Sequence, residues 1–148
     1  MAMSTPSPAD CLLCRIVRGE LAVERIVETD HVIGFMNEPE ALSRGHCVFF
    51  PKQHAPSLHE ADDAALADIL PLVKTVARAL GVETYNVLQN NGAIAGQTVF
   101  HVHVHLIPKW SESEGLVYDR GRGRQMDQKE LADRIRAGLG RSGYQRDE

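Results

Sequence analysis

The segment FHVHVHLIPK, residues 100–109, carries a histidine at every second position: His101, His103 and His105. Successive side chains of a β-strand point to opposite faces, so a strand here would place three imidazoles on one face and the intervening apolar residues on the other. The imidazoles would lie roughly 6.5–7 Å apart, too far for direct hydrogen bonds between neighbours. This spacing favours side chains that act on different parts of one ligand or serve different sites. The alternative is a half-exposed strand whose histidines are simply solvated.

The rest of the chain predicts an α+β fold, with an antiparallel five-stranded sheet, one long helix and short terminal helices. The long helix is expected at residues 60–80, with a kink or a break at Pro71 and an end at Gly81. Short helices are expected at 11–19 and 128–140, and strands at 23–29, 31–37, 46–52, 83–90 and 100–108.

Composition favours one globular domain. The chain has 148 residues, of which 43% are hydrophobic and 24% charged, with a formal net charge of −4. This charge gives no basic field for a nucleic-acid polymer, and no apolar run reaches the ~20 residues that span a bilayer. Residues 1–10 lack the features of a secretory signal, so we expect a disordered lead-in, a single domain over 11–148 and a cytoplasmic location.

Cys11 and Cys14 form a C-x-x-C pair, and the chain has only one further cysteine. Three cysteines do not make a disulfide framework, which favours a reducing compartment. The pair is compatible with a zinc site or with a redox pair, and its spacing alone does not distinguish the two.

Three blocks of the chain resemble, in order and spacing, the signatures of the histidine triad (HIT) family. NNGAIAGQTVFHVHVHLIP (90–108) resembles the His-φ-His-φ-His-φ-φ signature, where φ is apolar. GFMNEPEALSRGHCVFFPKQH (34–54) resembles the upstream loop and strand, and CLLCRIVRGEL (11–21) resembles the C-x-x-C helix of bacterial members. The resemblance implies a HIT-like domain, with a variable C-terminal tail from about residue 109.

The resemblance also implies a reaction: hydrolysis or transfer of a nucleotidyl group at the α-phosphate, through a covalent nucleotidyl-histidine. His103 matches the nucleophile, His105 the group that donates to the phosphate or the leaving group, and His46 a fourth histidine beside the nucleophile. Neutral imidazole suits this chemistry because its unperturbed pKa is about 6.5. A covalent intermediate divides one difficult displacement into two easier ones.

A nucleotide site follows from the same resemblance, with a purine favoured by stacking area. Asn37 matches the ribose-binding position, where many relatives carry Asp. Gln97, Thr98 and Asn90 match positions on the phosphate side. The apolar walls around the base match Leu13, Ile16 and Phe35.

Zinc-bearing relatives imply a structural zinc on four residues, with no organic cofactor: Cys11, Cys14, His54 and His101. The resemblance also implies a homodimer. Two other functions stay open: a metallohydrolase whose three alternating histidines hold a catalytic zinc, and a non-catalytic nucleotide-binding module. Dinucleoside polyphosphates and nucleoside phosphoramidates are the expected substrates, and a transferase acting on a sugar phosphate is an alternative within the same class.

Overall fold

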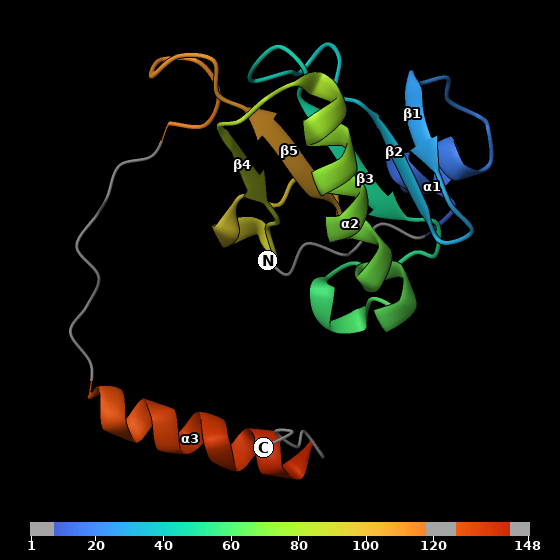
Figure 1. Cartoon of the computed structure of the whole chain (residues 1–148). Helices are drawn as coiled ribbons and strands as arrows, with labels where there is room; N and C mark the ends of the chain where they lie inside the picture. The colour runs from blue at the N-terminus through green and yellow to red at the C-terminus, as the bar shows by residue number, and fades with distance from the viewer. Residues whose placement is uncertain (1–7, 118–126, 143–148) are drawn as a thin grey trace. The chain divides into compact units, whose positions relative to one another are not determined.

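The computed structural model describes residues 8–117 and 127–142 (Figure 1). The chain divides into two compact units, Met1–Val117 and Tyr118–Glu148. Residues 1–7 of the expected lead-in lie outside the described residues. The first unit includes residues 109–117, which the sequence had assigned to the variable tail.

The first unit is built on a five-stranded antiparallel sheet, as predicted, and the strand order is β1-β2-β3-β5-β4. The strands are β1 (Arg25–Glu28), β2 (Val32–Met36), β3 (Cys47–Pro51), β4 (Tyr85–Leu88) and β5 (Val104–Pro108). Its helices are α1 (Leu12–Val17), α2 (Asp63–Leu80) and the 3₁₀ turns η1 (Leu58–Glu60) and η2 (Ala93–Ala95). Strand β3 lies at the centre, while β1 and β4 are the edges.

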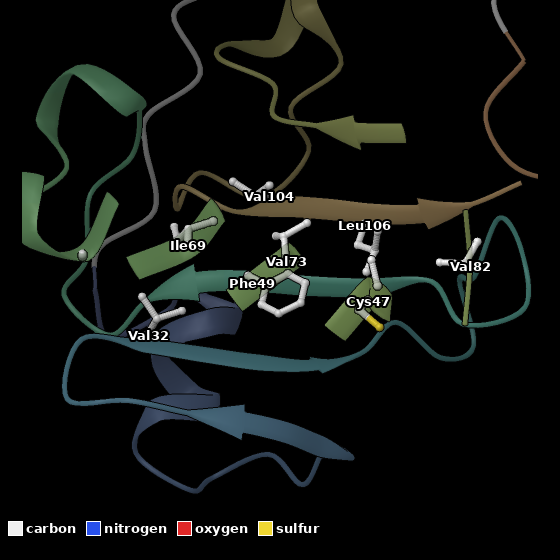
Figure 2. Packing of buried hydrophobic residues seen from close by; sticks show 10 residues of the cluster. Val32, Cys47, Phe49, Ile69, Val73, Val82, Val104 and Leu106 are labelled. Carbon is white, nitrogen blue, oxygen red and sulfur yellow. The ribbon is translucent and has the colours of Figure 1, made fainter. Parts of the chain in front are cut away.

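Residues of β3 alternate between two hydrophobic cores. Cys47 and Phe49 belong to a core that includes the buried face of α2, while Val48 and Phe50 belong to a core that includes the buried residues of α1. Figure 2 shows the first core, in which Ile69 and Val73 of α2 meet side chains of the sheet. All five residues of β3 are buried because the strand is covered on both faces.

Helix α2 runs through Pro71 as one helix, so the break that the sequence allowed does not occur. Gly81 follows its last residue with φ +69, a left-handed conformation that glycine adopts without a steric penalty. Across the described residues, no helix combines the length and apolar character needed to cross a membrane.

Strand β5 begins at Val104, so the prediction of a strand over 100–108 is too long. The preceding backbone makes other hydrogen bonds: the amide of Val102 donates to the carbonyl of Ala55 at 2.7 Å, and the amide of His101 donates to the carbonyl of Val99 at 2.9 Å. His101 and His103 therefore lie before the strand, and only His105 lies within it. Val102 and Leu106 are fully buried, as the alternating pattern predicts.

The second unit contains helix α3 (Gln128–Arg141), close to the helix expected at 128–140. The carboxylate of Asp127 caps it by accepting hydrogen bonds from the amides of Lys129 and Glu130.

We predict that Gly34→Ala destabilises the first unit. A Cβ at Gly34 would lie 2.7 Å from Cγ1 of Val27 and 2.8 Å from Cδ1 of Phe49, so strand and core would have to shift. Overpacking of this kind costs about 1–3 kcal/mol, which a urea unfolding curve measures. The control is Gly140→Ala, whose added Cβ meets no atom within 4 Å. Equal unfolding midpoints for the two variants would contradict the prediction.

Candidate functional site

Four side chains from distant parts of the chain form a cluster: Cys11, Cys14, His54 and His101. Cys11 caps α1, Cys14 lies within it, and the two histidines follow β3 and precede β5. One potential ligand atom from each residue lies within 4.8 Å of those from the other three. The sequence predicted this group, and the fold brings it together.

The separations in this cluster match those of a tetrahedral metal site. Nδ1 of His101 lies 3.4 Å from Sγ of Cys11 and 3.5 Å from Sγ of Cys14, and Nδ1 of His54 lies 3.3 Å from Sγ of Cys14. With Zn–S of about 2.3 Å and Zn–N of about 2.0–2.1 Å, sulfur and nitrogen ligands of a tetrahedral zinc lie about 3.6 Å apart. The donor set therefore fits zinc.

Protonation in the cluster also suits a cation. Nε2 of His101 donates to the carbonyl of Pro51 at 2.7 Å, so Nδ1 keeps its lone pair on the side of the two sulfurs. Burial lowers the pKa of His101 to about 4, which keeps the ring neutral. Burial, and then Cys11, raise the pKa of the Cys14 thiol to about 11. A bound cation would reverse this last effect by stabilising the thiolate.

His103 is oriented by the backbone of His101. Its Nδ1 donates to the carbonyl of His101 at 2.6 Å, so the neutral ring carries its lone pair on Nε2. Burial lowers the pKa of His103 below its ordinary value, which favours this neutral form. The ring is half-buried and lines a pocket, so a nucleophilic nitrogen is available to a ligand there.

His105 lies between His103 and His46. The ring centroids of His103 and His105 are 4.9 Å apart, and Nδ1 of His105 lies 2.9 Å from Nε2 of His46. His46, which was expected beside the nucleophile, contacts His105 and is only 2% exposed. This arrangement arises because β3 and β5 are paired, with His105 opposite Val48, two residues after His46.

The pocket beside these histidines is lined by most of the predicted nucleotide-binding residues: Leu13, Phe35, Asn37, Asn90 and Thr98, together with His103 and His105. Gly96 also lines it, and four further lining residues were not predicted: Leu12, Glu40, Val48 and Val99. Leu12 precedes Leu13 and Val99 follows Thr98 in the sequence. This adjacency to predicted site residues is the one signal that could have placed Leu12 and Val99 at the pocket. Glu40 lies in a loop whose path the sequence pattern does not specify.

Ile16 is separated from this pocket. It is 2% exposed and lines a neighbouring pocket. Four residues line both pockets: Leu12, Phe35, Asn37 and Glu40.

Gln97 does not line the pocket, although the sequence predicted a phosphate contact for it. Its Oε1 accepts from the amide of Gly92 at 2.7 Å, and its Nε2 donates to the carbonyls of Pro56 at 2.7 Å and Val99 at 3.1 Å. The side chain is 4% exposed. These bonds make Gln97 an anchor of the loop that carries Asn90 and Thr98.

The three alternating histidines thus serve two places. In the part of the chain that the structure describes, the potential metal cluster takes only His101 from the triad, and His103 and His105 line the pocket. A single metal held by all three imidazoles does not match this geometry.

Comparison with known proteins identifies the family to which the chain belongs. The profile of the HIT domain matches residues 18–112, which is more than half of the chain. The chain belongs to the histidine triad (HIT) family. It is 49% identical, over 106 residues, to the adenosine 5'-monophosphoramidase of Schizosaccharomyces pombe; the match covers 72% of this chain and 79% of the relative.

Two further HIT proteins extend the comparison. The adenylylsulfatase of Arabidopsis thaliana is 38% identical over 104 residues, which cover 68% of this chain and 52% of the plant protein. The crystal structure of a histidine triad nucleotide-binding protein from Candida albicans superposes with a TM-score of 0.80 at 35% identity, covering 90% of this chain and 99% of that one.

Proposed function

We propose that this HIT protein is a nucleotide hydrolase or nucleotidyl transferase that acts at the α-phosphate through a covalent nucleotidyl-His103 intermediate. The observation that carries the proposal is the 2.6 Å hydrogen bond from Nδ1 of His103 to the carbonyl of His101. It leaves Nε2 as the basic nitrogen of a ring that lines the pocket. The acceptor is a neutral carbonyl, so it orients the ring without adding a negative charge that would repel a phosphate.

In the first step, the lone pair on Nε2 of His103 attacks the α-phosphorus. A P–N bond forms, and the bond from phosphorus to the leaving group breaks. Burial lowers the pKa of His105 to about 4, so its ring is neutral and acts as a hydrogen-bond donor to the phosphoryl oxygen or to the leaving group. The leaving group takes the electron pair, and its proton comes from solvent. Asn90 and Thr98 line the same pocket and offer neutral donors to the phosphoryl oxygens, where transition-state charge develops.

In the second step, water attacks the same phosphorus and the P–N bond to His103 breaks. The attacking water gives up a proton to solvent, His103 leaves phosphorus as a neutral imidazole, and the nucleoside monophosphate is released. Attack by another acceptor in place of water would make the protein a transferase. Splitting the displacement into two steps is the advantage of nucleophilic catalysis.

The nucleoside is proposed to occupy the apolar part of the pocket. Leu13 and Phe35 form walls for the base, and stacking area favours a purine. Asn37 lines the pocket as the predicted partner of the ribose hydroxyls. The names of two relatives, an adenosine 5'-monophosphoramidase and an adenylylsulfatase, support adenosine 5'-phosphoramidates and adenylyl anhydrides as the substrates to assay.

A structural zinc on Cys11, Cys14, His54 and His101 is part of the proposal. It would join α1 to the segments after β3 and before β5, and so hold Leu13 of α1 at the pocket. The thiols of Cys11 and Cys14 are free, which is consistent with a reducing compartment, and we propose the cytoplasm.

A homodimer is the proposed assembly, with β4 and α2 at its interface. Strand β4 is an edge of the sheet, and it leaves Val87 45% exposed. On α2, Leu70 is 62% exposed. Val87 and Leu70 line one apolar pocket together with Leu66 and Ile69, and a second copy would remove this surface from water.

His103→Ala is expected to lower turnover of adenosine 5'-phosphoramidate on the order of 10³-fold or more, because no other nucleophile replaces the imidazole. Binding of adenosine monophosphate should persist, since the base and ribose contacts lie elsewhere in the pocket. Mass spectrometry of the quenched wild-type reaction should detect a nucleotidyl adduct on His103. The control is His59→Ala, an exposed histidine outside the site. Full turnover in His103→Ala would end the covalent mechanism, and binding without turnover in the wild type would identify a nucleotide-binding module.

Protein purified without added zinc should contain one zinc per chain by metal analysis, and Cys14→Ser should lose it. Loss of the metal should lower Tm, because binding free energy at a structural site contributes to folding. Cys47→Ser is the matched control: its thiol is also buried, but it lies in the core with α2 and should leave the zinc content unchanged. A reduced wild-type protein with an empty site would contradict the assignment.

Sedimentation at micromolar concentration should give the mass of two chains. Val87→Asp should shift the mass towards one chain, because the carboxylate would be buried at the interface. Ile26→Asp adds the same charge to the opposite edge strand, at a residue 39% exposed, and should leave the dimer intact. A wild-type mass of one chain would refute the proposed assembly.

A further inference from the structure

The phosphate-side loop, residues 90–98, supplies three lining residues to the pocket that contains His103: Asn90, Gly96 and Thr98. Residues 93–96 are exposed, and the loop contains only the short turn η2. Apolar burial therefore contributes little to its conformation, and hydrogen bonds to neighbouring segments hold it in place. Gln97 anchors one end of the loop, and Asn91 forms a separate anchor at the other end.

The side chain of Asn91 binds a backbone group from a distant part of the chain. The amide of Leu58, the first residue of η1, donates to Oδ1 of Asn91 at 2.8 Å. A backbone N–H only donates, so the oxygen of the Asn91 amide faces Leu58 and its nitrogen points elsewhere. Asn91 therefore joins the phosphate-side loop to the segment between β3 and α2.

Gln89, the residue that follows β4, completes this anchor. Nδ2 of Asn91 donates to Oε1 of Gln89 at 2.6 Å, and Nε2 of Gln89 donates to Oδ1 of Asn91 at 3.2 Å. The same Nε2 donates to the carbonyl of Asn90 at 2.9 Å. The paired side-chain amides thus hold the peptide group that joins Asn90 to Asn91.

These bonds act on a residue that the pocket uses, because Asn90 lines the pocket and Asn91 does not. Strand β4 fixes the chain up to Leu88, and the Gln89–Asn91 pair fixes the peptide after Asn90, so Asn90 is held from both sides. Nδ2 of Asn90 donates to the carbonyl of Gly96 at 3.4 Å, which leaves its second amide hydrogen for a ligand.

The two anchors of the loop are independent of each other. Gln97 is buried and donates to the carbonyl of Pro56, whereas Asn91 is half-buried and accepts from Leu58. Loss of the Asn91 anchor leaves the bonds of Gln97 in place. A variant at Asn91 should therefore alter the position of Asn90 more than the stability of the fold.

We propose that Asn91 is a positioning residue for phosphate binding: its amide, paired with Gln89 and bonded to Leu58, directs Asn90 towards the α-phosphate of the substrate. The inference rests on the proposed function, which places the α-phosphate beside Asn90 and Thr98. It has a specific consequence. The bonds of Asn91 should support binding of the phosphate but not of the nucleoside, whose proposed walls belong to α1 and β2.

Calorimetric titration with adenosine monophosphate and with adenosine tests this consequence. Asn91→Ala should weaken binding of the monophosphate roughly 10-fold, the effect of about one lost hydrogen bond, because a displaced Asn90 no longer donates to the phosphate. Binding of adenosine should be unchanged. The control is Ile94→Ala, which truncates a fully exposed side chain of the same loop and should alter neither affinity. Equal losses for the two ligands, or an unchanged affinity for the monophosphate, would overturn the inference.

A backbone variant tests the same bond without altering Asn91. Leu58→Pro removes the amide hydrogen that Asn91 accepts. Proline suits this position, since Leu58 begins a helical turn and the preceding Ser57 is extended, with φ −133 and ψ 167. The matched control is Leu58→Ala, which truncates the side chain and keeps the amide.

Leu58→Pro should reproduce the selective loss of affinity for adenosine monophosphate, and Leu58→Ala should not. Equal affinities in these two variants would overturn the inference, even if Asn91→Ala does not fold.

Turnover distinguishes failure of this inference from failure of the proposed function. With adenosine 5'-phosphoramidate, Asn91→Ala should lower kcat/KM roughly 10-fold or more and still form the adduct on His103. Full turnover in His103→Ala would reject the proposed function, and the selective loss of monophosphate affinity in Asn91→Ala would stand. A wild-type protein that binds adenosine monophosphate no more tightly than adenosine would reject the inference, since Asn91 would have no phosphate contact to support.

Discussion

The fully buried imidazole of His101 is the point on which the site depends. Its Nε2 donates to the carbonyl of Pro51 at the end of β3, and its Nδ1 lies against the two sulfurs of the α1 segment. Its own carbonyl accepts from Nδ1 of His103. One residue thus joins helix α1 beside the pocket, the central strand and His103, the proposed nucleophile. A displacement of His101 would alter the geometry of the pocket and the orientation of His103 together.

The two histidines that line the pocket differ because their backbone partners differ. His103 gives its Nδ1 hydrogen to a carbonyl, which leaves a lone pair on Nε2 for attack. His105 accepts at Nδ1 from His46, which leaves a hydrogen on Nε2 for donation. Their ring centroids lie only 4.9 Å apart, so burial alone cannot give them opposite roles. The direction of the neighbouring hydrogen bonds does: it leaves a lone pair on one ring and a hydrogen-bond donor on the other.

Much of the fold followed from periodicity. The alternation around β5 and the apolar run of β3 predicted buried strands, and Gly81 predicted the end of α2. The start of β5 was placed too early, because the alternation in sequence continues where the backbone bonds to the loop at Ala55 instead of to another strand. Pro71 did not divide α2, because the buried face of that helix extends on both sides, from Ala65 and Ile69 to Val73 and Ala77.

By itself, the sequence determined the antiparallel α+β fold, the family and the membership of most of the site, since strand alternation and motif spacing are local properties of the chain. It did not determine the orientation of Gln97, whose side chain bonds to backbone groups of Gly92, Pro56 and Val99. Nor did it determine the side chain that His46 contacts, which is His105. Only the tertiary structure decided these points, and with them the placement of Glu40 at the pocket and the tautomers of His46, His101 and His103. The reason is physical: which ring nitrogen carries a hydrogen depends on the donor or acceptor that faces it. For His101 that group is the carbonyl of Pro51, which is remote in sequence. For His46 and His103 it is a nearby backbone group whose direction no sequence periodicity predicts.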